Sequence, residues 1–473
     1  MKNNLTAKIF KSIYVFVLLF CTSHSLFAQY EGLIPKVTTQ TPNSVALFKA
    51  EAKPVGSYTG TSAINLPLFK VSSQSLVDNV SISYTNGGIK VEEISSWVGL
   101  GWNLNCGGRI SRTVNGEPDD NPSKGLLYTT LKPSAFPGSN SIQNSSLVVS
   151  GQLDVEPDIF YFNFSVRSGK FYFDENGNLR IIDKTELKID FYTNNGIKGW
   201  VITDEKGTQY YFGLDKSHVN SATDISNISY DGTGSVPSPA EAYISSWHLL
   251  EIRDMNEQNI IKYEYEQNFT NFTTRNGSFM AISGVTGLDC SPTETVGQEM
   301  FVLNNTSEYH LKKISTNNQV LIFQSSLSRE DLSGGVKLNE IWLCTKTNQT
   351  QPIKKFQFNY GYFTSPNAPA GTLNDTYYKR LKLNSVSEFG TNNTTSNSHI
   401  FNYHEDVNLP SRFSYSVDYW GYYNGANNFD LLANGEYNTG SGSYSVFNNA
   451  DRRSYPYYAK ANTLKEIIYP TGG

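Results

Sequence analysis

Two tryptophans and two adjacent glutamates occur in one glycine-rich stretch, residues 86–120, and these are residue types that can bind and cleave a glycan. The indole of Trp97 or Trp102 can stack on a sugar ring, and Glu92 or Glu93 can act on the glycosidic bond. Glycosidase chemistry needs two carboxyl groups about 5 to 9 Å apart across a cleft. Neighbouring residues of a strand point to opposite faces, so the two glutamates make a poor catalytic pair. We therefore interpret the stretch as a structural corner of the fold.

A second aromatic cluster, Asp-Tyr-Trp-Gly-Tyr-Tyr-Asn, lies near the end of the chain and contains Trp420 and Tyr422. It offers stacking surface for a glycan, although core and rim packing is the favoured interpretation. Together with the two tryptophans of the first stretch, these residues are the candidate ligand-binding side chains: Trp97, Trp102, Trp420 and Tyr422. The acidic run Asp119-Asp120-Asn121 could ligate calcium through oxygen atoms, but the sequence favours an exposed acidic turn.

The motifs of common catalytic sites are absent from the sequence. There is no Gly-x-Ser-x-Gly, no His-Glu-x-x-His and no phosphate-binding loop, and Gly99-Leu-Gly101 lacks the third glycine of a dinucleotide fingerprint. The sequence thus predicts no catalytic residue, no metal site and no cofactor. A formal net charge of −5 argues against a nucleic-acid partner.

Aromatic residues make up 13% of the chain, with 30 Tyr and 27 Phe, while charged residues make up only 17%. Flat rings pack well on pleated sheets, so this composition favours an all-β fold. Alternation of apolar and polar residues predicts strands such as 80–84, a three-stranded meander over 158–182 and a hairpin over 199–212.

The chain divides into four parts by composition. Residues 1–28 are typical of a signal peptide, because lysines precede an apolar core at Ile13–Phe20 that is too short to span a bilayer. Residues 29–216 carry strand and turn signals throughout, which predicts a β-sandwich-like N-terminal domain. Small polar residues and prolines at 217–239 predict a linker. Residues 240–473 follow as a domain of β-hairpin repeats, and no later apolar run is long enough to form a transmembrane helix.

The hairpin repeats are marked by a recurring Leu-x-x-Ile or Leu-x-x-Val segment. Most copies are followed by a polar turn and an aromatic strand, so each unit is predicted to be a hairpin. A single hairpin is marginally stable, and successive hairpins must therefore pair edge to edge. The five copies begin at Leu249, Leu311, Leu338, Leu383 and Leu464. An ordinary β-sandwich with coincidental spacing is the alternative.

Several motifs resemble the N-terminal region of the secreted RHS/YD-repeat proteins of Bacteroidota. They are Tyr58-Thr-Gly60 with Ile64–Leu68, Gly88–Glu92, Ser96–Trp102, Leu409–Arg412, Asp418–Gly425 and Leu464–Gly473. The resemblance implies a non-catalytic module, secreted or on the outer cell surface, whose hairpins lead into a YD/RHS-type sheet. It also implies that the partner is a downstream shell or toxin region of the same polypeptide. Such proteins continue into a further strand after Gly473, which predicts a repeat domain that is incomplete at its C-terminus.

Two other functions are compatible with the sequence. A carbohydrate-binding surface protein would use the candidate aromatic residues to hold surface glycans. A secreted glycan hydrolase would need two carboxyl groups facing each other across a cleft.

Overall fold

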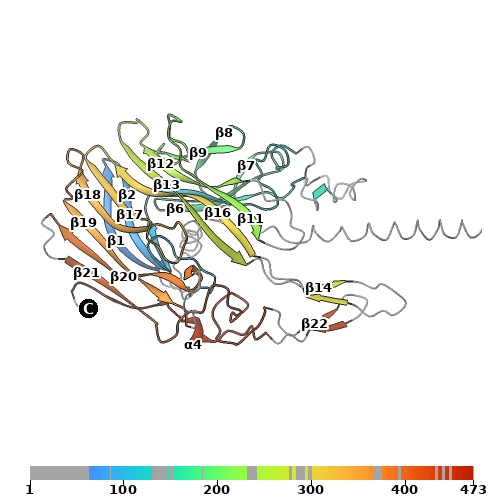
Figure 1. The fold of residues 1–473 in the computed structure, drawn as a ribbon. Coiled ribbons are helices and arrows are strands. Elements are labelled where there is room, and N and C mark those ends of the chain that lie inside the picture. The colour runs from blue at the N-terminus through green and yellow to red at the C-terminus, as the bar shows by residue number, and fades with distance from the viewer. Residues whose placement is uncertain are drawn as a thin grey trace, which may run out of the picture.

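The structure, a computed structural model, is almost entirely β-strand, which confirms the predicted all-β class (Figure 1). The predicted signal peptide, residues 1–28, lies outside the described residues. The structure describes residues 63–471 except 86, 130, 131, 133, 135–146, 149–152, 184, 232–241, 276–279, 284–292, 297–300, 367–374, 392–395, 432–434, 439–442 and 447–449. No helix in this described part is both long and apolar enough to cross a membrane.

Most strands belong to one large antiparallel sheet, called the main sheet. Its strands are β4 (Gly108–Thr113), β5 (Ile159–Phe164), β6 (Arg167–Phe173), β7 (Leu179–Ile181), β8 (Lys188–Thr193), β9 (Ile197–Thr203), β10 (Gln209–Phe212), β11 (Thr223–Asp231), β12 (Tyr243–Arg253), β13 (Ile260–Arg275), β16 (Phe301–Ser315), β17 (Gln319–Ser326), β18 (Lys337–Thr345), β19 (Lys354–Thr364), β20 (Lys379–Gly390), β21 (Ser396–Tyr403) and β24 (Leu464–Ile468).

The remaining elements are short or form separate sheets. The N-terminal sheet consists of β1 (Ala63–Ser73), β2 (Leu76–Thr85) and β3 (Trp102–Asn105). Two small hairpins project from the body (Figure 1): β14 (Met280–Ser283) with β15 (Thr293–Val296), and β22 (Gly435–Asn438) with β23 (Ser443–Val446). Two short helical elements among the described residues are η3 (Asp375–Tyr377) and α4 (Pro456–Ala459).

Strand β12 is the branch point of the main sheet. It pairs with β11 and β4 in its first half and with β10 and β13 in its second half. Because β11 and β13 both pair with β16, the pairings close on themselves through β11, β12, β13 and β16. The predicted meander is confirmed as β5–β6–β7, and the predicted hairpin as β9–β10.

The predicted linker over 217–239 is wrong for its described part. Residues 223–231 form β11, which pairs with β12 and with β16. Asp224 is buried in this strand, whereas a solvated linker would expose it. A strand that is paired on both edges is stabilised by backbone hydrogen bonds. Small polar residues form these bonds as well as apolar residues do, so their composition does not exclude a strand. The main sheet therefore runs through the predicted domain boundary.

The N-terminal sheet packs on the face of the main sheet formed by the hairpin repeats (Figure 1). Phe69 of β1 meets Phe356 of β19 edge to face, with ring centroids 5.0 Å apart. The Leu464 backbone N–H donates to the Tyr84 hydroxyl at 2.9 Å. Strands from both predicted domains thus share one hydrophobic core, and the predicted division into a sandwich-like domain at 29–216 and a repeat domain at 240–473 does not describe the packing.

Each Leu-x-x-Ile segment lies in a strand of the main sheet and contains a β-bulge. Side chains alternate along a regular strand, so residues three apart would face opposite ways. In β18, Ser325 pairs with Leu338 and Gln324 pairs with Glu340, which leaves Asn339 as the extra residue. The bulge returns the two apolar side chains of the segment to the same buried face. The extra residues in the other four copies are Leu250, Lys312, Asn384 and Lys465.

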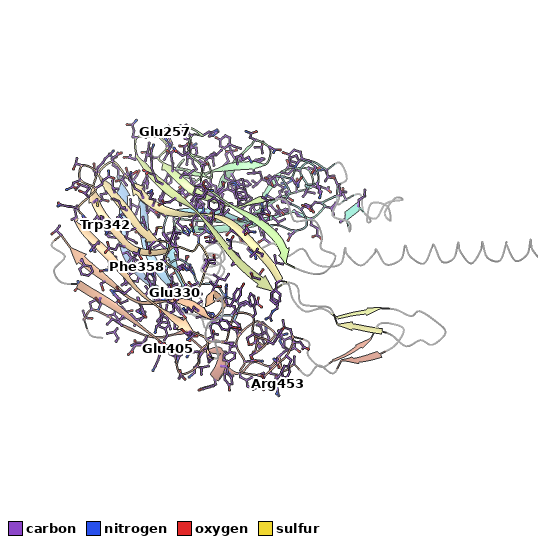
Figure 2. All side chains as sticks on the ribbon, viewed as in Figure 1. Glu257, Glu330, Trp342, Phe358, Glu405 and Arg453 are labelled. Carbon is purple, nitrogen blue, oxygen red and sulfur yellow. The ribbon has the colours of Figure 1, made fainter. Side chains whose placement is uncertain are left out.

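A tyrosine hydroxyl caps the leucine carbonyl in three of these units. Regular pairing between β18 and β19 begins at Glu340, one residue beyond the bulge, so the carbonyl of Leu338 has no ladder partner in β19. The Tyr360 hydroxyl donates to that carbonyl at 2.6 Å. Figure 2 shows the crowded side chains of these strands, among them Trp342 of β18 and Phe358 of β19. The same bond joins Tyr265 to Leu249 at 2.8 Å and Tyr403 to Leu383 at 2.6 Å.

Each of these tyrosines also pairs through its backbone with the leucine of the next unit. Tyr360, for example, lies opposite Leu383 in the β19–β20 ladder. Each of these tyrosines therefore caps the bulge of the preceding unit with its hydroxyl, and its backbone pairs with the bulged strand of the following unit. The unit between β16 and β17 has Ser325 at the corresponding place.

The stretch 86–120 differs from the prediction in its first half. The segment Ile89–Glu92, which contains the first of the two adjacent glutamates, is not a strand and makes only an isolated bridge, between Lys90 and Tyr422. Residues 97–101 form turns, with positive φ of 119° at Gly99 and 75° at Gly101. A side chain at Gly99 would meet the backbone of Leu383, so glycine lets this segment lie directly on the repeat sheet.

Candidate functional site

The structure places Trp102 in the core, which makes its prediction as a ligand-binding residue wrong. Only 1% of Trp102 is exposed. Its indole N–H donates to the Tyr403 hydroxyl at 2.9 Å, and its ring packs on Phe401 with centroids 4.5 Å apart. Trp97 is 7% exposed and tilts against His310, with centroids 5.2 Å apart. Neither indole presents a free face for stacking on a sugar.

Trp420 and Tyr422 lie in the aromatic loop, residues 418–422, and the structure separates their roles. Trp420 is 63% exposed. Tyr422 is partly buried, and its hydroxyl donates to the Gly87 carbonyl at 2.9 Å. Its ring lies so close to Gly88 that a side chain there would collide with it. Trp420 thus keeps the properties of a ligand-binding residue, while Tyr422 anchors the loop to the segment after β2.

Asp418 holds the aromatic loop in shape. Its Oδ1 accepts the backbone N–H groups of Trp420 and Tyr422, both at 2.9 Å. Arg452 donates to the Asp418 carbonyl at 2.8 Å and lies over the ring of Tyr419, 5.4 Å from its centroid. These contacts fix the backbone of the loop, so the loop that carries Tyr419 and Trp420 has its shape before any ligand arrives.

Glu92 and Glu93 are engaged by different partners. Glu92 lies 3.8 Å from the Arg275 guanidinium, while a carboxylate oxygen of Glu93 accepts the Lys90 backbone N–H at 3.2 Å. Both residues lie in or just after a turn and not in the strand expected from the sequence.

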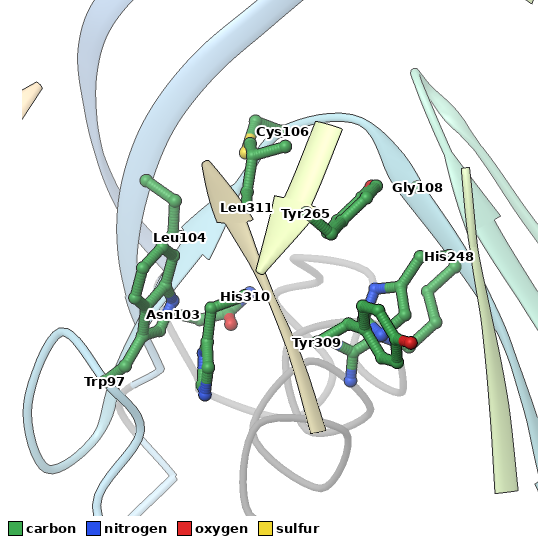
Figure 3. Close-up of a pocket in the computed structure, with 11 residues that line it drawn as sticks. Trp97, Asn103, Leu104, Cys106, Gly108, His248, Tyr265, Tyr309, His310 and Leu311 are labelled. Atoms are coloured by element: carbon green, nitrogen blue, oxygen red, sulfur yellow. The ribbon is translucent and has the colours of Figure 1, made fainter. Parts of the chain in front are cut away.

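A small pocket opens where β3, β4, β12, β13 and β16 meet (Figure 3), and we call it the Arg109 pocket. Its volume is about 60 Å³. Figure 3 shows the Trp97 and His310 rings side by side and Tyr309 next to His248. The lining residues are Trp97, Asn103, Leu104, Cys106, Gly108, Arg109, His248, Tyr265, Tyr309, His310 and Leu311.

The two histidines of the Arg109 pocket are buried. His248 Nε2 lies 2.8 Å from a carboxylate oxygen of Asp224, and that oxygen also accepts the Tyr309 backbone N–H at 2.8 Å. Burial lowers the pKa of His248 in spite of this carboxylate. Burial also lowers the pKa of His310 to about 3, which makes its ring neutral.

The predicted acidic turn at Asp119 and Asp120 is buried instead of exposed. Asp120 accepts a hydrogen bond from the Arg112 guanidinium at 2.5 Å. Asp119 and Asp158 exchange hydrogen bonds, because each carboxylate accepts the backbone N–H of the other residue, at 3.0 and 3.1 Å. Burial, together with the mutual repulsion of these carboxylates, raises the pKa of Asp119.

Calcium binding by this acidic cluster finds no support in the geometry. No group of three or more His, Cys, Asp or Glu among the residues with described positions is arranged to hold a metal ion. Arg112 supplies the positive charge instead, and it lies 3.6 Å from Asp158 as well.

The sequence did not reveal the Arg109 pocket because Asp224, which bonds to His248 of its lining, falls in the predicted linker. Their contact follows from the pairing of β11 with β12, in which Asp224 lies opposite Ser246. A strand assignment for residues 223–231 would have been the signal.

No protein-family model and no curated protein sequence matches the chain. Among solved structures, the chain is similar to the N-terminal domain of effector protein SpvB from Salmonella typhimurium strain LT2, with 14% sequence identity. The match covers 72% of this chain and 93% of that one, with a TM-score of 0.23. A TM-score of this size does not establish a shared fold.

Proposed function

We propose that the chain is a non-catalytic structural and interaction module of a secreted or cell-surface RHS/YD-repeat protein. In this role its hairpins start or close a shell that belongs to the same polypeptide. The shell, a toxin region or surface glycans are the partners that this proposal names.

The observation that carries the proposal is the repeated bulge. Five Leu-x-x-Ile or Leu-x-x-Val segments share the same register shift, and in three units a tyrosine links one bulge to the next. Such a unit contacts mainly its neighbours in the sheet, which is the principle by which repeat proteins bury hairpins that are unstable alone.

Ser96–Trp102, one of the motifs that carry the family resemblance, lies against the hairpin repeats. Within Ser96–Trp102, the Trp97 carbonyl accepts the Leu338 N–H at 3.0 Å, and the Leu100 N–H donates to the Leu381 carbonyl at 2.8 Å. These bonds join the turn to two successive bulged strands, β18 and β20. A role in organising the repeat sheet accounts for the tryptophans and glycines of this motif without any ligand.

The DNA that follows the codon for Gly473 tests the proposal. An open reading frame that continues into bulged hairpins and a variable tail would support it. A stop codon followed by an unrelated gene would overturn the assignment to a repeat shell.

The exposed rings of the aromatic loop favour a second candidate function, carbohydrate binding. Tyr419 and Trp420 are 66% and 63% exposed, and Asp418 and Arg452 fix the loop that presents them. Arg452 lies over one face of the Tyr419 ring, so a sugar would stack on Trp420 or on the other face of Tyr419.

A glycan array with the full chain tests this second function. Saturable binding that is lost in Trp420→Ala and kept in Tyr469→Ala, a matched change at another exposed ring, would support it. Equal binding by wild type and Trp420→Ala, with unchanged melting temperatures, would overturn it. Trp97→Ala is unsuitable as a test because the buried indole is part of the core.

A further inference from the structure

The wall of the Arg109 pocket presents hydrogen-bond donors and no carboxylate. Its polar side chains are one guanidinium, two imidazoles, one amide, two phenols, one indole and one thiol, and the lining found in the described chain includes no Asp or Glu. Asp224 stands behind this wall, where one of its oxygens already accepts from His248 and from the Tyr309 backbone. A cavity lined in this way favours a ligand that accepts hydrogen bonds.

Several of these donors lack a partner. The Nε and one terminal nitrogen of Arg109, and Nε2 of His310, are buried without a hydrogen bond to any described residue. His310 is 6% exposed, so bulk water does not replace the missing partner. Buried polar groups are nearly always satisfied, and an orphaned one points to a bound water, ion or ligand.

The acidic residues nearest to these donors do not satisfy them. Asp224 lies 4.0 Å from the terminal nitrogen of Arg109, and Glu308 lies 3.7 Å from Nε2 of His310. Both separations exceed hydrogen-bonding distance. They also limit the affinity of an anionic ligand, because Asp224 and Glu308 repel it.

We infer that the Arg109 pocket binds a small oxyanion, held by the Arg109 guanidinium and by His310 in the tautomer that carries its proton on Nε2. A guanidinium presents parallel N–H groups that match the oxygens of a carboxylate or phosphate group. A pocket volume of about 60 Å³ accommodates roughly four to six water-sized groups, which is the size of acetate or phosphate. The Trp97 ring closes the side next to His310. Given the repulsion from Asp224 and Glu308, we expect a dissociation constant on the order of 1 mM.

The test measures binding to the full chain by isothermal titration and by melting temperature, at constant ionic strength. Sodium phosphate and sodium acetate are the probes, and sodium chloride is the reference. We expect saturable binding of one oxyanion per chain, weakened about tenfold or more in Arg109→Gln. The control is Arg180→Gln, which removes an exposed arginine of β7 paired with Asp174, and it should bind like wild type.

Phosphate raises the stability of folded proteins in general. Binding in the pocket is therefore measured as the difference in the phosphate effect between wild type and Arg109→Gln. If Arg109→Gln fails to fold, His310→Gln provides the same comparison without removing a charge. Preference of phosphate over acetate, or the reverse, distinguishes a phosphate ligand from a carboxylate one. Binding that is absent for both probes, or equal in wild type and both variants, would mean that the pocket holds water only and would overturn the inference.

Discussion

Replacing Tyr360 by Phe removes the hydroxyl that caps the bulge of β18. In the wild type this hydroxyl donates to the Leu338 carbonyl at 2.6 Å. The ring can stay in place, because phenylalanine has the same shape without the oxygen. The carbonyl then loses its donor at a point where β18 and β19 no longer pair regularly.

The expected cost can be worked out from that one bond. A hydrogen bond contributes about 0.5 to 1.5 kcal/mol net, and a buried acceptor left without a partner costs about 1 to 3 kcal/mol. We therefore expect Tyr360→Phe to lower the free energy of unfolding by about 1 to 3 kcal/mol. Tyr403→Phe should cost more, because its hydroxyl donates to Leu383 and also accepts the Trp102 indole N–H.

Tyr362→Phe is the matched control, since it changes the same residue type two positions further along β19. Its hydroxyl accepts the Glu330 backbone N–H at 3.0 Å and donates to the Ser328 carbonyl at a long 3.4 Å, and both contacts are exposed. Water can replace exposed partners, so the change should cost less than about 0.5 kcal/mol. Urea unfolding gives the three free energies. Hydrogen exchange of the β18 amides checks whether the loss is local, because a chain of this size need not unfold in two states.

The order of the three variants is the decisive result. Equal stability of Tyr360→Phe and Tyr362→Phe would show that the capping bond contributes nothing. A Tyr403→Phe variant no less stable than Tyr360→Phe would show that the Trp102 contact does not act through the hydroxyl.

Three further variants test the buried charges and a glycine. Asp119→Asn should raise the free energy of unfolding at pH 8 by about 1 to 3 kcal/mol. Folding raises the pKa of the Asp119 carboxyl, and such a group destabilises the fold as the pH rises above about 4. Urea unfolding of the variant should therefore show a smaller loss of stability between pH 5 and pH 8 than wild type. Arg112→Met should lower the free energy of unfolding by about 3 to 5 kcal/mol, because the buried carboxylates of Asp120 and Asp158 lose their cation; a loss below about 1 kcal/mol would contradict this. Gly213→Ala should lower the free energy of unfolding by about 1 to 3 kcal/mol, since Gly213 has a φ of 75° and a side chain there would collide with Trp247. Gly390 has open space around it, so the control Gly390→Ala should change the melting temperature little.

The strands were predictable where the side-chain pattern is local. The alternation in Val80–Tyr84 predicted a strand that is found within β2, and the Leu-x-x-Ile segments lie, as predicted, in hairpins that pair edge to edge, in every second strand from β12 to β24. The bulges were not predicted, although they explain why apolar residues three apart can share a buried face. A bulge depends on the register of the partner strand, which one sequence does not reveal.

The candidate site was harder to predict because burial is decided by distant parts of the chain. Trp102 is covered by residues about 300 positions later, including Tyr403. Aromatic residues beside glycines are compatible both with a sugar platform and with a tightly packed corner, and only the covering strands distinguish the two. Trp420 resembles Trp102 in sequence context, yet it is exposed because its loop lies outside the paired strands.

The position of the N-terminal sheet has a consequence for the order in which the chain can fold. Strands β1–β3 are synthesised first, but Tyr84 and Trp102 find their hydrogen-bonding partners at Leu464 and Tyr403. Phe69 is covered only once Phe356 has emerged, and Tyr84 and Trp102 stay uncovered on their far side until the last hairpin is available. Contacts of such long sequence separation slow folding and expose sticky surface. We expect the nascent chain to depend on a holding chaperone until residue 464 is free.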